Sequence, residues 1–273
     1  LATPVAIMGN HIVDTCGTGG DGASTFNVST ASAFVVAAAG ATVAKHGNRS
    51  ISSSSGSADV LEAAGVNLDI TADQVKHCID SIGLGFMFAQ KHHGAMKHAI
   101  GPRRDMAVRT IFNLLGPLTN PAQSPNQVLG VFDKKWVEPM AQVLKTLGSK
   151  HVLVVHAEDG LDEISIGSDS YVAELNNGEI ETYTIKPEDF GLQQANIEQL
   201  AVSDAKQSLA IITAIFAGEA GPARDIVSLN AGAAIYAADL ASSLAEGIKL
   251  AQQHIDNGSA QQKLDEFIAC TNA

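Results

Sequence analysis

Basic residues are scarce in this sequence. Lys and Arg number 17 against 29 Asp and Glu, so the 273 residues carry a net charge of −12. Nonspecific nucleic-acid binding depends on basic faces, and this balance therefore argues against a nucleic-acid partner. It also means that an anionic substrate must be met by local cations or a metal ion rather than by the overall field. Aromatic residues make up only 5% of the chain, which suits closely packed α/β layers.

Cysteine is also rare. Cys16, Cys78 and Cys270 are odd in number, lie far apart in the sequence and show neither zinc-site spacing nor a disulfide framework. We therefore expect reduced thiols and a cytoplasmic protein, with Cys16 a small buried residue rather than a nucleophile. No apolar run reaches membrane-span length and no signal peptide is visible, so we expect no membrane partner. The chain begins Leu1-Ala2-Thr3-Pro4 without Met, from which we expect a natural N-terminus that is missing here.

The stretch DTCGTGGDGASTFNVST, residues 14–30, is the most informative part of the chain. An apolar run at 11–16 predicts a strand, the glycines that follow predict a tight loop, and 27–39 predict a helix that stops at Gly40. Glycines let backbone N–H groups approach a ligand closely, and a helix start adds free N–H groups with partial positive charge. This order predicts a phosphate site. A plain strand-to-helix turn is the alternative.

Asp21 lies inside this loop, where neither a plain turn nor a bare phosphate site needs a carboxylate. We expect it to contact a sugar hydroxyl or a metal ion. The spacing Gly17, Gly19, Gly22 also satisfies the dinucleotide fingerprint, which expects an acid at the end of the second strand. Residues 41–45 predict that strand, but it ends with Lys45 and, shortly after, Arg49. These cations suit phosphate or carboxylate, and only a 2′-phosphorylated nicotinamide cofactor would keep the dinucleotide alternative open.

A second cluster follows the apolar strand predicted at 151–156. Glu158, Asp159, Asp162 and Glu163 come at its carboxyl end, which in a parallel sheet is the edge that also carries the glycine loop. Carboxylate oxygens suit Mg²⁺, which holds substrate phosphates through one or two carboxylates and several waters. We prefer Asp162-Glu163 as the metal ligands because apolar Leu161 and Ile164 flank that pair, whereas a solvated acidic loop is the alternative.

The remaining patterns complete an α/β fold with a mainly parallel sheet. They predict a helix from Thr71 to about Ile82, strands at 85–89 and 128–131, and a helix at 138–147. Asn177-Gly178 predicts a hairpin between strands at 171–175 and 180–185, and helices follow from 208 onward with a loop at 218–225. Basic residues from Lys91 to Arg109, including the pair His92-His93, are expected mostly on a solvated helix face. Ser57 is expected to cap the next helix.

Five blocks in order resemble the anthranilate phosphoribosyltransferase family of tryptophan biosynthesis: DTCGTGGDGASTFNVST, VAKHGNRSISSSSGSADVLEAAG, RTIFNLLGPLTNP, GLDEIS and GPARDIVSLNAGAAIY. The resemblance covers nearly the whole chain. It implies Mg²⁺-dependent transfer of phosphoribose from 5-phosphoribosyl diphosphate (PRPP) to the anthranilate amine, an α/β domain at 1–70 and 105–273, and a remnant of a small helical domain at 71–104. It also implies a homodimer.

The same resemblance implies roles for individual residues. Those expected to bind PRPP are Gly17, Thr18, Gly19, Gly20, Asp21, Thr25, Asn27, Ser29, Thr30, Lys45 and Ser57. Those expected on the anthranilate side are Gly17, His46, Asn48, Arg103 and Pro117, with Arg103 the candidate for the carboxylate. Those expected to bind Mg²⁺ are Ser29, Asp162 and Glu163. No residue is expected to act as a general acid or base.

The chain departs from the family pattern in two ways. The family carries several N-terminal helices that are absent here, and it often has Pro-Ala-Met-Lys where this chain has Gly94-Ala95-Met96-Lys97. Two rival assignments stay open. A pyrimidine nucleoside phosphorylase has a similar loop but would read more like Lys-His-Ser-Thr-Gly-Gly, and a noncatalytic nucleic-acid-binding relative of the fold would need a basic groove.

Overall fold

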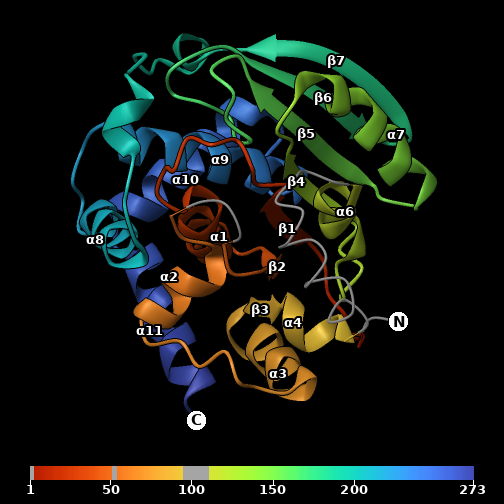
Figure 1. Cartoon of the computed structure of the whole chain (residues 1–273), viewed down its shortest axis with the longest axis vertical. Helices are drawn as coiled ribbons and strands as arrows, with labels where there is room; N and C mark the ends of the chain where they lie inside the picture. The colour runs from red at the N-terminus through yellow and green to blue at the C-terminus, as the bar shows by residue number, and fades with distance from the viewer. Residues whose placement is uncertain (1–2, 51–53, 95–110) are drawn as a thin grey trace.

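A computed structural model describes residues 3–50, 54–94 and 111–273 (Figure 1). Its centre is one seven-stranded sheet in the order β3-β2-β1-β4-β5-β6-β7. The strands are β1 (Ile12–Gly17), β2 (Thr42–Gly47), β3 (Leu84–Phe88), β4 (Asn126–Gly130), β5 (His151–Ala157), β6 (Ser170–Asn176) and β7 (Glu179–Ile185). The first five are parallel, and β6 and β7 add antiparallel pairs at one edge. The predicted α/β fold with a mainly parallel sheet is confirmed.

Helices cover both faces of this sheet. They are α1 (Val28–Ala38), α2 (Ser57–Ala63), α3 (Ala72–Ile82), α4 (Ala89–His92), α6 (Ile111–Leu115), α7 (Val137–Thr146), α8 (Ala205–Phe216), α9 (Pro222–Ala237), α10 (Leu244–Asp256) and α11 (Ser259–Thr271). One face packs against α1 and α9, while α7 and α3 cover the other. None of the helices in the described ranges has the length and apolar character needed to cross a membrane.

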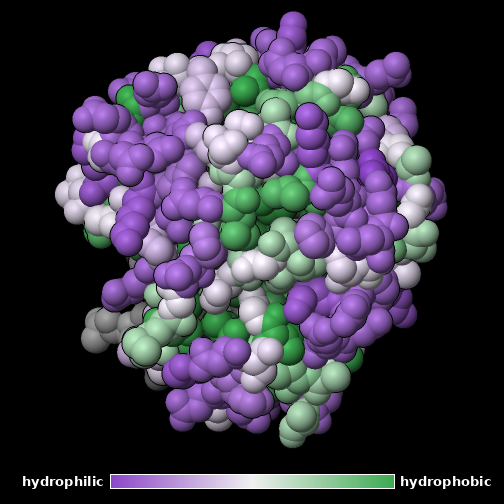
Figure 2. All heavy atoms as spheres, turned by 180° about the vertical axis from the view of Figure 1, so that it is seen from behind, coloured by the Kyte–Doolittle hydropathy of each residue, from purple (hydrophilic) through white to green (hydrophobic). Residues whose placement is uncertain are grey.

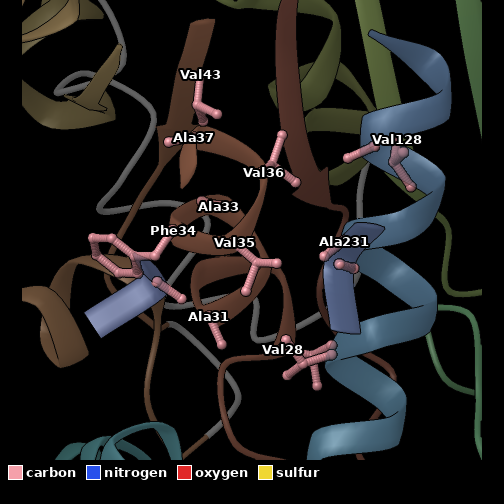
Figure 3. Packing of buried hydrophobic residues seen from close by; sticks show 14 of the residues in the cluster. Val28, Ala31, Ala33, Phe34, Val35, Val36, Ala37, Val43, Val128 and Ala231 are labelled. Atoms are coloured by element: carbon pink, nitrogen blue, oxygen red, sulfur yellow. The ribbon is translucent and has the colours of Figure 1, made fainter. Parts of the chain in front are cut away.

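The largest core surrounds α1, which is apolar nearly all round because it has packing partners on every side. It contacts α9, α11 and the strands that precede and follow it in the chain, β1 and β2. In Figure 3, side chains of α1 such as Phe34 and Val36 lie with Val43 of β2, Val128 of β4 and Ala231 of α9. A helix that is hydrophobic all round must be buried. The core therefore fixes the direction of α1 and with it the start of the helix after the glycine loop.

The outer surface has a mixed character. Figure 2, which views the molecule from behind, shows hydrophilic side chains around the periphery and a narrower band of hydrophobic side chains through the middle of that face. The large apolar side chains exposed within the described ranges are Met8, Ile111, Leu115, Val143 and Leu147. Ile111 and Leu115 lie on α6, Val143 and Leu147 lie at the end of α7, and Met8 precedes β1.

Several sequence predictions need correction at their boundaries. The loop expected at 218–225 ends earlier, because α9 already begins at Pro222. Ser57 is the first residue of α2, and Gly56 occupies the cap position. The helix predicted from Thr71 is confirmed, with the Thr71 hydroxyl accepting from the Gln74 amide. β3 lies within 71–104 and is the edge strand of the main sheet. The predicted division into two domains stays a prediction.

Candidate functional site

The glycine loop that follows β1 lies against the acidic loop that follows β5. The Gly19 amide donates a hydrogen bond of 2.6 Å to the Asp162 carboxylate, across 143 residues of sequence. Gly19 and Gly20 have φ values of 64° and 79°, a left-handed conformation that glycine adopts without strain. Both loops therefore occupy one edge of the sheet, as the carboxyl ends of parallel strands require.

Two glycines make this close approach possible. A Cβ added to Gly17 would lie 2.4 Å from the Asp162 carboxylate oxygen, and one added to Gly130 would lie 1.5 Å from the Asp162 carbonyl oxygen. No side chain fits at either position without moving Asp162. Gly17 was predicted as a site residue for its loop, but Gly130, the last residue of β4, was not. Only its place at a strand end hinted at a role.

The second carboxylate of the pair reaches the start of α1. Glu163 accepts a hydrogen bond of 3.2 Å from the Ser29 amide, one of the free N–H groups of the first helical turn. The backbone after Glu163 is held by Asn230 of α9, which accepts from the Ile164 amide and donates to the Ile164 carbonyl, both at 2.9 Å. Asn230 was not predicted from the sequence, since nothing in its helix distinguishes it from a packing residue.

The electrostatics of the acidic pair favour a cation. Burial raises the pKa of Asp162, and the nearby Asp21 charge raises it further. Burial likewise raises the pKa of Glu163, with Asp162 adding to the effect. Two carboxylates that resist ionisation together would both ionise readily beside a divalent cation. By contrast, Glu158 and Asp159 of the same loop are exposed, and Asp159 accepts from the Ser165 hydroxyl at 2.5 Å.

The residues present fit Mg²⁺ without forming a complete cage. Within the described ranges, no group of three or more His, Cys, Asp or Glu side chains is arranged to hold a metal ion. Mg²⁺ commonly takes only one or two carboxylates and completes its shell with water and substrate phosphates. Asp162 and Glu163, with the Ser29 hydroxyl close to the same helix start, supply a donor set of that type.

Lys45 is the buried cation of the site. Its Nζ donates to the Thr15 carbonyl and lies 3.3 Å from the Ser29 hydroxyl. Burial lowers the pKa of Lys45, and the nearby Asp14, Cys16 and Glu163 offset this effect only in part. Arg49, expected as a second cation for phosphate or carboxylate, is instead paired with Asp59 and Glu62 at 3.0 and 2.8 Å. Both partners lie on the following helix, α2, so Arg49 already binds carboxylates of the chain itself.

Hydroxyl and amide groups gather around the start of α1. Asn27 stands at the cap position but does not cap the helix; its Oδ1 accepts from the Ser55 and Ser208 hydroxyls at 2.7 and 2.8 Å. The Thr30 hydroxyl is buried and has no hydrogen-bond partner among the described residues. Thr18 and Thr25 line the loop, where Thr18 accepts from the Phe132 amide and Thr25 forms an isolated bridge with Ala201.

The predicted acceptor residues lie at the end of β2 and beyond. His46 is buried, and its Nε2 lies 3.1 Å from Nε2 of His93. Burial lowers the pKa of His46 to about 3, with His93, His92 and Lys45 adding to the effect, so the ring is neutral. His93 was not predicted as a site residue, and its neighbour His92, expected on a solvated face, is buried with Nδ1 2.9 Å from the Thr3 carbonyl.

Pro117 and Asn48 complete the described part of this side. The Pro117 carbonyl accepts from Gln127 of β4 at 3.0 Å, and the Asn48 side chain accepts from the Arg49 amide at 2.8 Å. Arg103, predicted to bind the acceptor carboxylate, lies outside the described residues. Cys16 accepts from Gln127 at 3.1 Å, and burial raises the pKa of its thiol well above the usual value. This agrees with the prediction that Cys16 is no nucleophile.

Comparison with known proteins shows the general class of enzyme to which the chain belongs. Residues 9–261 match the glycosyl transferase family, a/b domain, and the chain belongs to that family. A curated anthranilate phosphoribosyltransferase from Thioalkalivibrio sulfidiphilus is 63% identical over 271 residues, which are 99% of this chain and 80% of that relative. Within the glycosyl transferases, the chain therefore belongs to the anthranilate phosphoribosyltransferases, as its motifs predicted.

Solved structures agree with this placement. The anthranilate phosphoribosyltransferase of Thermus thermophilus is similar with a TM-score of 0.94 and 44% identity, covering 100% of this chain and 81% of that one. The enzyme of Saccharomyces cerevisiae, solved in complex with PRPP and Mg, is similar with a TM-score of 0.89 and 27% identity, covering 99% and 77%. The rival assignments to a nucleoside phosphorylase or a noncatalytic relative find no support in these matches.

Proposed function

We propose that this chain transfers phosphoribose from PRPP to the amine of anthranilate and releases diphosphate, in tryptophan biosynthesis. The observation that carries the proposal is the junction of the glycine loop with Asp162 and Glu163 at one sheet edge. Backbone N–H groups of the loop and of the helix start, beside the buried Asp162 and the half-buried Glu163, suit a ligand that carries phosphates together with a divalent metal ion.

The donor side is assigned to the loop and the start of α1. Amides of Gly17–Asp21 and the side chains of Thr25, Asn27, Ser29, Thr30, Lys45 and Ser57 would hold the phosphates and ribose of PRPP. The unpartnered Thr30 hydroxyl supports this, since a buried hydroxyl without a partner is costly unless a ligand uses it. Lys45 supports it too, because its buried ammonium lies beside the Ser29 hydroxyl at the helix start.

Asp162, Glu163 and the Ser29 hydroxyl would hold Mg²⁺. When bound, the ion would neutralise charge on the diphosphate and stabilise it as a leaving group. The protein's own contribution at this position is the pair of carboxylates, kept in place by Asn230 and by the two glycines that allow Asp162 to approach.

The acceptor side is assigned to Gly17, His46, Asn48, Arg103 and Pro117. A neutral His46 ring suits an aromatic ligand, because it brings no charge to be desolvated. An arginine can bind a carboxylate through two parallel hydrogen bonds, which is the role proposed for Arg103. Anthranilate offers an aromatic amine that is already unprotonated at neutral pH, so the reaction needs no strong general base.

The chemistry is displacement at the anomeric carbon of ribose. The C–O bond to diphosphate breaks as the C–N bond to the amine forms, and the amine then loses a proton to solvent. Positive charge builds on the sugar ring and negative charge on the leaving group, which the loop amides and Lys45 would stabilise. Holding both substrates in line across the sheet edge supplies much of the remaining rate. We further propose a homodimer, as the family resemblance implies, and a cytoplasmic location, as the scarce, unpaired cysteines predict.

A turnover assay tests the proposal. The chain is incubated with PRPP, Mg²⁺ and anthranilate, and the loss of anthranilate and the release of diphosphate are measured together. Equal amounts of both, dependent on all three additions, are expected. Absence of turnover, combined with clear binding of single-stranded DNA at physiological salt, would favour the noncatalytic alternative and overturn the proposal.

A further inference from the structure

The neighbouring strands β1 and β2 part early. β1 and β2 are in register only as far as the pair Val13 and Val43. On their other sides, β2 stays paired with β3 as far as Gly47, and β1 stays paired with β4 as far as Gly17. A gap therefore opens between β1 and β2 toward the sheet edge that carries the candidate site.

In this gap, side chains replace the neighbouring strand's backbone groups as hydrogen-bond partners. In a continued parallel ladder, the Thr15 amide would donate to the Ala44 carbonyl, and after it the His46 amide would donate to the Thr15 carbonyl. Instead, the His46 amide donates to Oδ1 of Asp14 at 3.1 Å, and the Thr15 carbonyl accepts from Nζ of Lys45. These two backbone groups are thus hydrogen-bonded rather than frayed, as buried backbone groups require.

Asn120 continues the same network to the acceptor side. Its Nδ2 donates to Oδ2 of Asp14 at 2.8 Å and to the Ala44 carbonyl of β2 at 2.9 Å. Its Oδ1 accepts from the Ala122 amide at 2.8 Å. Asn120 directly follows the 3₁₀ turn Gly116–Thr119, which contains Pro117. Asp14 is therefore bonded through one oxygen to β2 and through the other to the residue that ends this turn.

Asp14 and Asn120 lie between the groups assigned to the PRPP side and those assigned to the anthranilate side. Asp14 is completely buried and lies close enough to Lys45 for their charges to interact. If the ladder continued, the Thr15 carbonyl would pair with His46 and Lys45 would lose its buried acceptor. With the gap held open, Lys45 reaches the Ser29 hydroxyl, while the next residue, His46, lies against His93.

We propose that Asp14 and Asn120 are positioning residues, which hold β1 and β2 apart so that Lys45 serves the phosphate side and His46 with the Pro117 turn serves the acceptor side. The inference rests on the proposed function, since it uses the donor and acceptor sides assigned there. It adds two residues that would touch neither substrate and act through their neighbours.

Two single variants test the role. In Asp14→Asn, the new amide can still accept from His46 but opposes the Nδ2 donor of Asn120. In Asn120→Asp, two carboxylates face each other. Because one gap positions both Lys45 and His46, we expect each variant to raise the KM for PRPP and the KM for anthranilate together, by about tenfold, the change expected for one lost charge-assisted hydrogen bond.

The double variant provides the rescue. Asp14→Asn with Asn120→Asp again places an N–H donor opposite a carboxylate, with the direction reversed. We expect it to recover part of both KM values, but not all, since the Ala44 carbonyl then lacks its donor. If Asp14→Asn does not fold, Asn120→Ser is measured instead, because it leaves the bond between Asp14 and the His46 amide intact.

A matched control separates positioning from stability. Asn126 is a buried asparagine of β4, and its Nδ2 donates to the Ile12 carbonyl at 3.0 Å, at the opposite end of the strands. Asn126→Ala should lower the melting temperature and leave both KM values unchanged. If the Asp14 and Asn120 variants behave like this control, or if the double variant recovers neither KM, the positioning role is overturned. Absence of wild-type turnover would count against the proposed function instead.

Discussion

The Asp162 carboxylate accepts a 2.6 Å hydrogen bond from the Gly19 amide, so an acidic side chain occupies a backbone donor of the glycine loop. A phosphate group would compete for the same N–H. A metal ion bound by Asp162 would draw that carboxylate away and free the amide for the substrate. The geometry thus links metal binding to substrate binding at a single hydrogen-bond donor.

Gly130→Ala tests whether the site needs the close approach of Asp162. The added methyl group would lie 1.5 Å from the Asp162 carbonyl oxygen, so the acidic loop must move. We expect turnover to fall by at least about 100-fold, because small misplacements of positioned groups cost about that much. Gly116→Ala, where nothing lies within 4 Å of the added atom, should leave the melting temperature unchanged. Normal turnover of Gly130→Ala would show that Asp162 need not hold this position.

Arg103→Ala tests the acceptor side. Loss of a bidentate bond to the anthranilate carboxylate should raise the KM for anthranilate by roughly tenfold to 100-fold and leave the KM for PRPP nearly unchanged. Arg103→Lys should recover only part of the loss, since an ammonium cannot make both parallel bonds. Arg104→Ala serves as the control for net charge. An effect mainly on the KM for PRPP would contradict the assignment.

His151→Gln tests an ion cluster around a buried histidine at the opposite end of the sheet. Nε2 and Nδ1 of His151 lie 3.1 and 2.9 Å from carboxylate oxygens of Glu174 and Asp239, and Glu174 also accepts from the Tyr183 hydroxyl at 2.6 Å. Burial alone would lower the pKa of His151, but the hydrogen bonds to Glu174 and Asp239 outweigh it and raise the pKa.

The sign of the pH dependence follows from that raised pKa. Stability from a His with a raised folded-state pKa is fully present below its unfolded value of about 6.5 and is lost as pH rises through the folded value. The substitution should therefore cost more free energy of unfolding at pH 6 than at pH 9, where about 1 kcal/mol or less should remain. Tyr183→Phe removes a bond to the same carboxylate without removing the imidazole, so its cost should be equal at both pH values. An equal cost of His151→Gln would refute the charged cluster.

Thiol titration tests a contact that the sequence concealed. The sulfur atoms of Cys78 in α3 and Cys270 in α11 lie 2.7 Å apart although 192 residues separate them, and all three cysteines are free. Cys270 is partly exposed, so a hydroperoxide can oxidise it to a sulfenic acid with release of an alcohol. Attack by the Cys78 sulfur then gives a disulfide and water.

After such oxidation, we expect one remaining thiol, that of Cys16, in the unfolded protein. The bond would join two elements across a long loop and stabilise the fold by roughly 2–4 kcal/mol. In Cys78→Ser, no disulfide should form within the chain. Three remaining thiols in the treated wild type would show that the contact does not support the bond.

The sequence predicted those features that follow from one strand and the loop after it. The glycine loop, Lys45 and Asp162-Glu163 were found because parallel strands place their carboxyl ends on one edge. Features that depend on packing between distant elements were missed. Asn230 of α9 holds the backbone at Ile164, and the His93 ring packs against His46. Arg49 pairs with acidic residues of α2, a contact that the sequence did not reveal.

The Asp14 and Asn120 network shows the limit most clearly. Both residues belong to motifs that the sequence identified, yet neither motif indicates that β1 and β2 part after Val13. Strand register is set by the whole sheet, whereas a motif records only local order. The residues of this site can therefore be predicted from sequence motifs more readily than the gap between the two strands that carry them.

Calorimetric titration with PRPP, with and without Mg²⁺, measures the central claim most directly. In the wild type, we expect Mg²⁺ to tighten PRPP binding by at least about tenfold. In Asp162→Ala with Glu163→Ala, this dependence should disappear, and turnover should fall by about 100-fold or more. Glu158→Ala, in the exposed part of the same loop, should bind like the wild type. Mg²⁺-dependent binding that persists in the double variant would contradict the account.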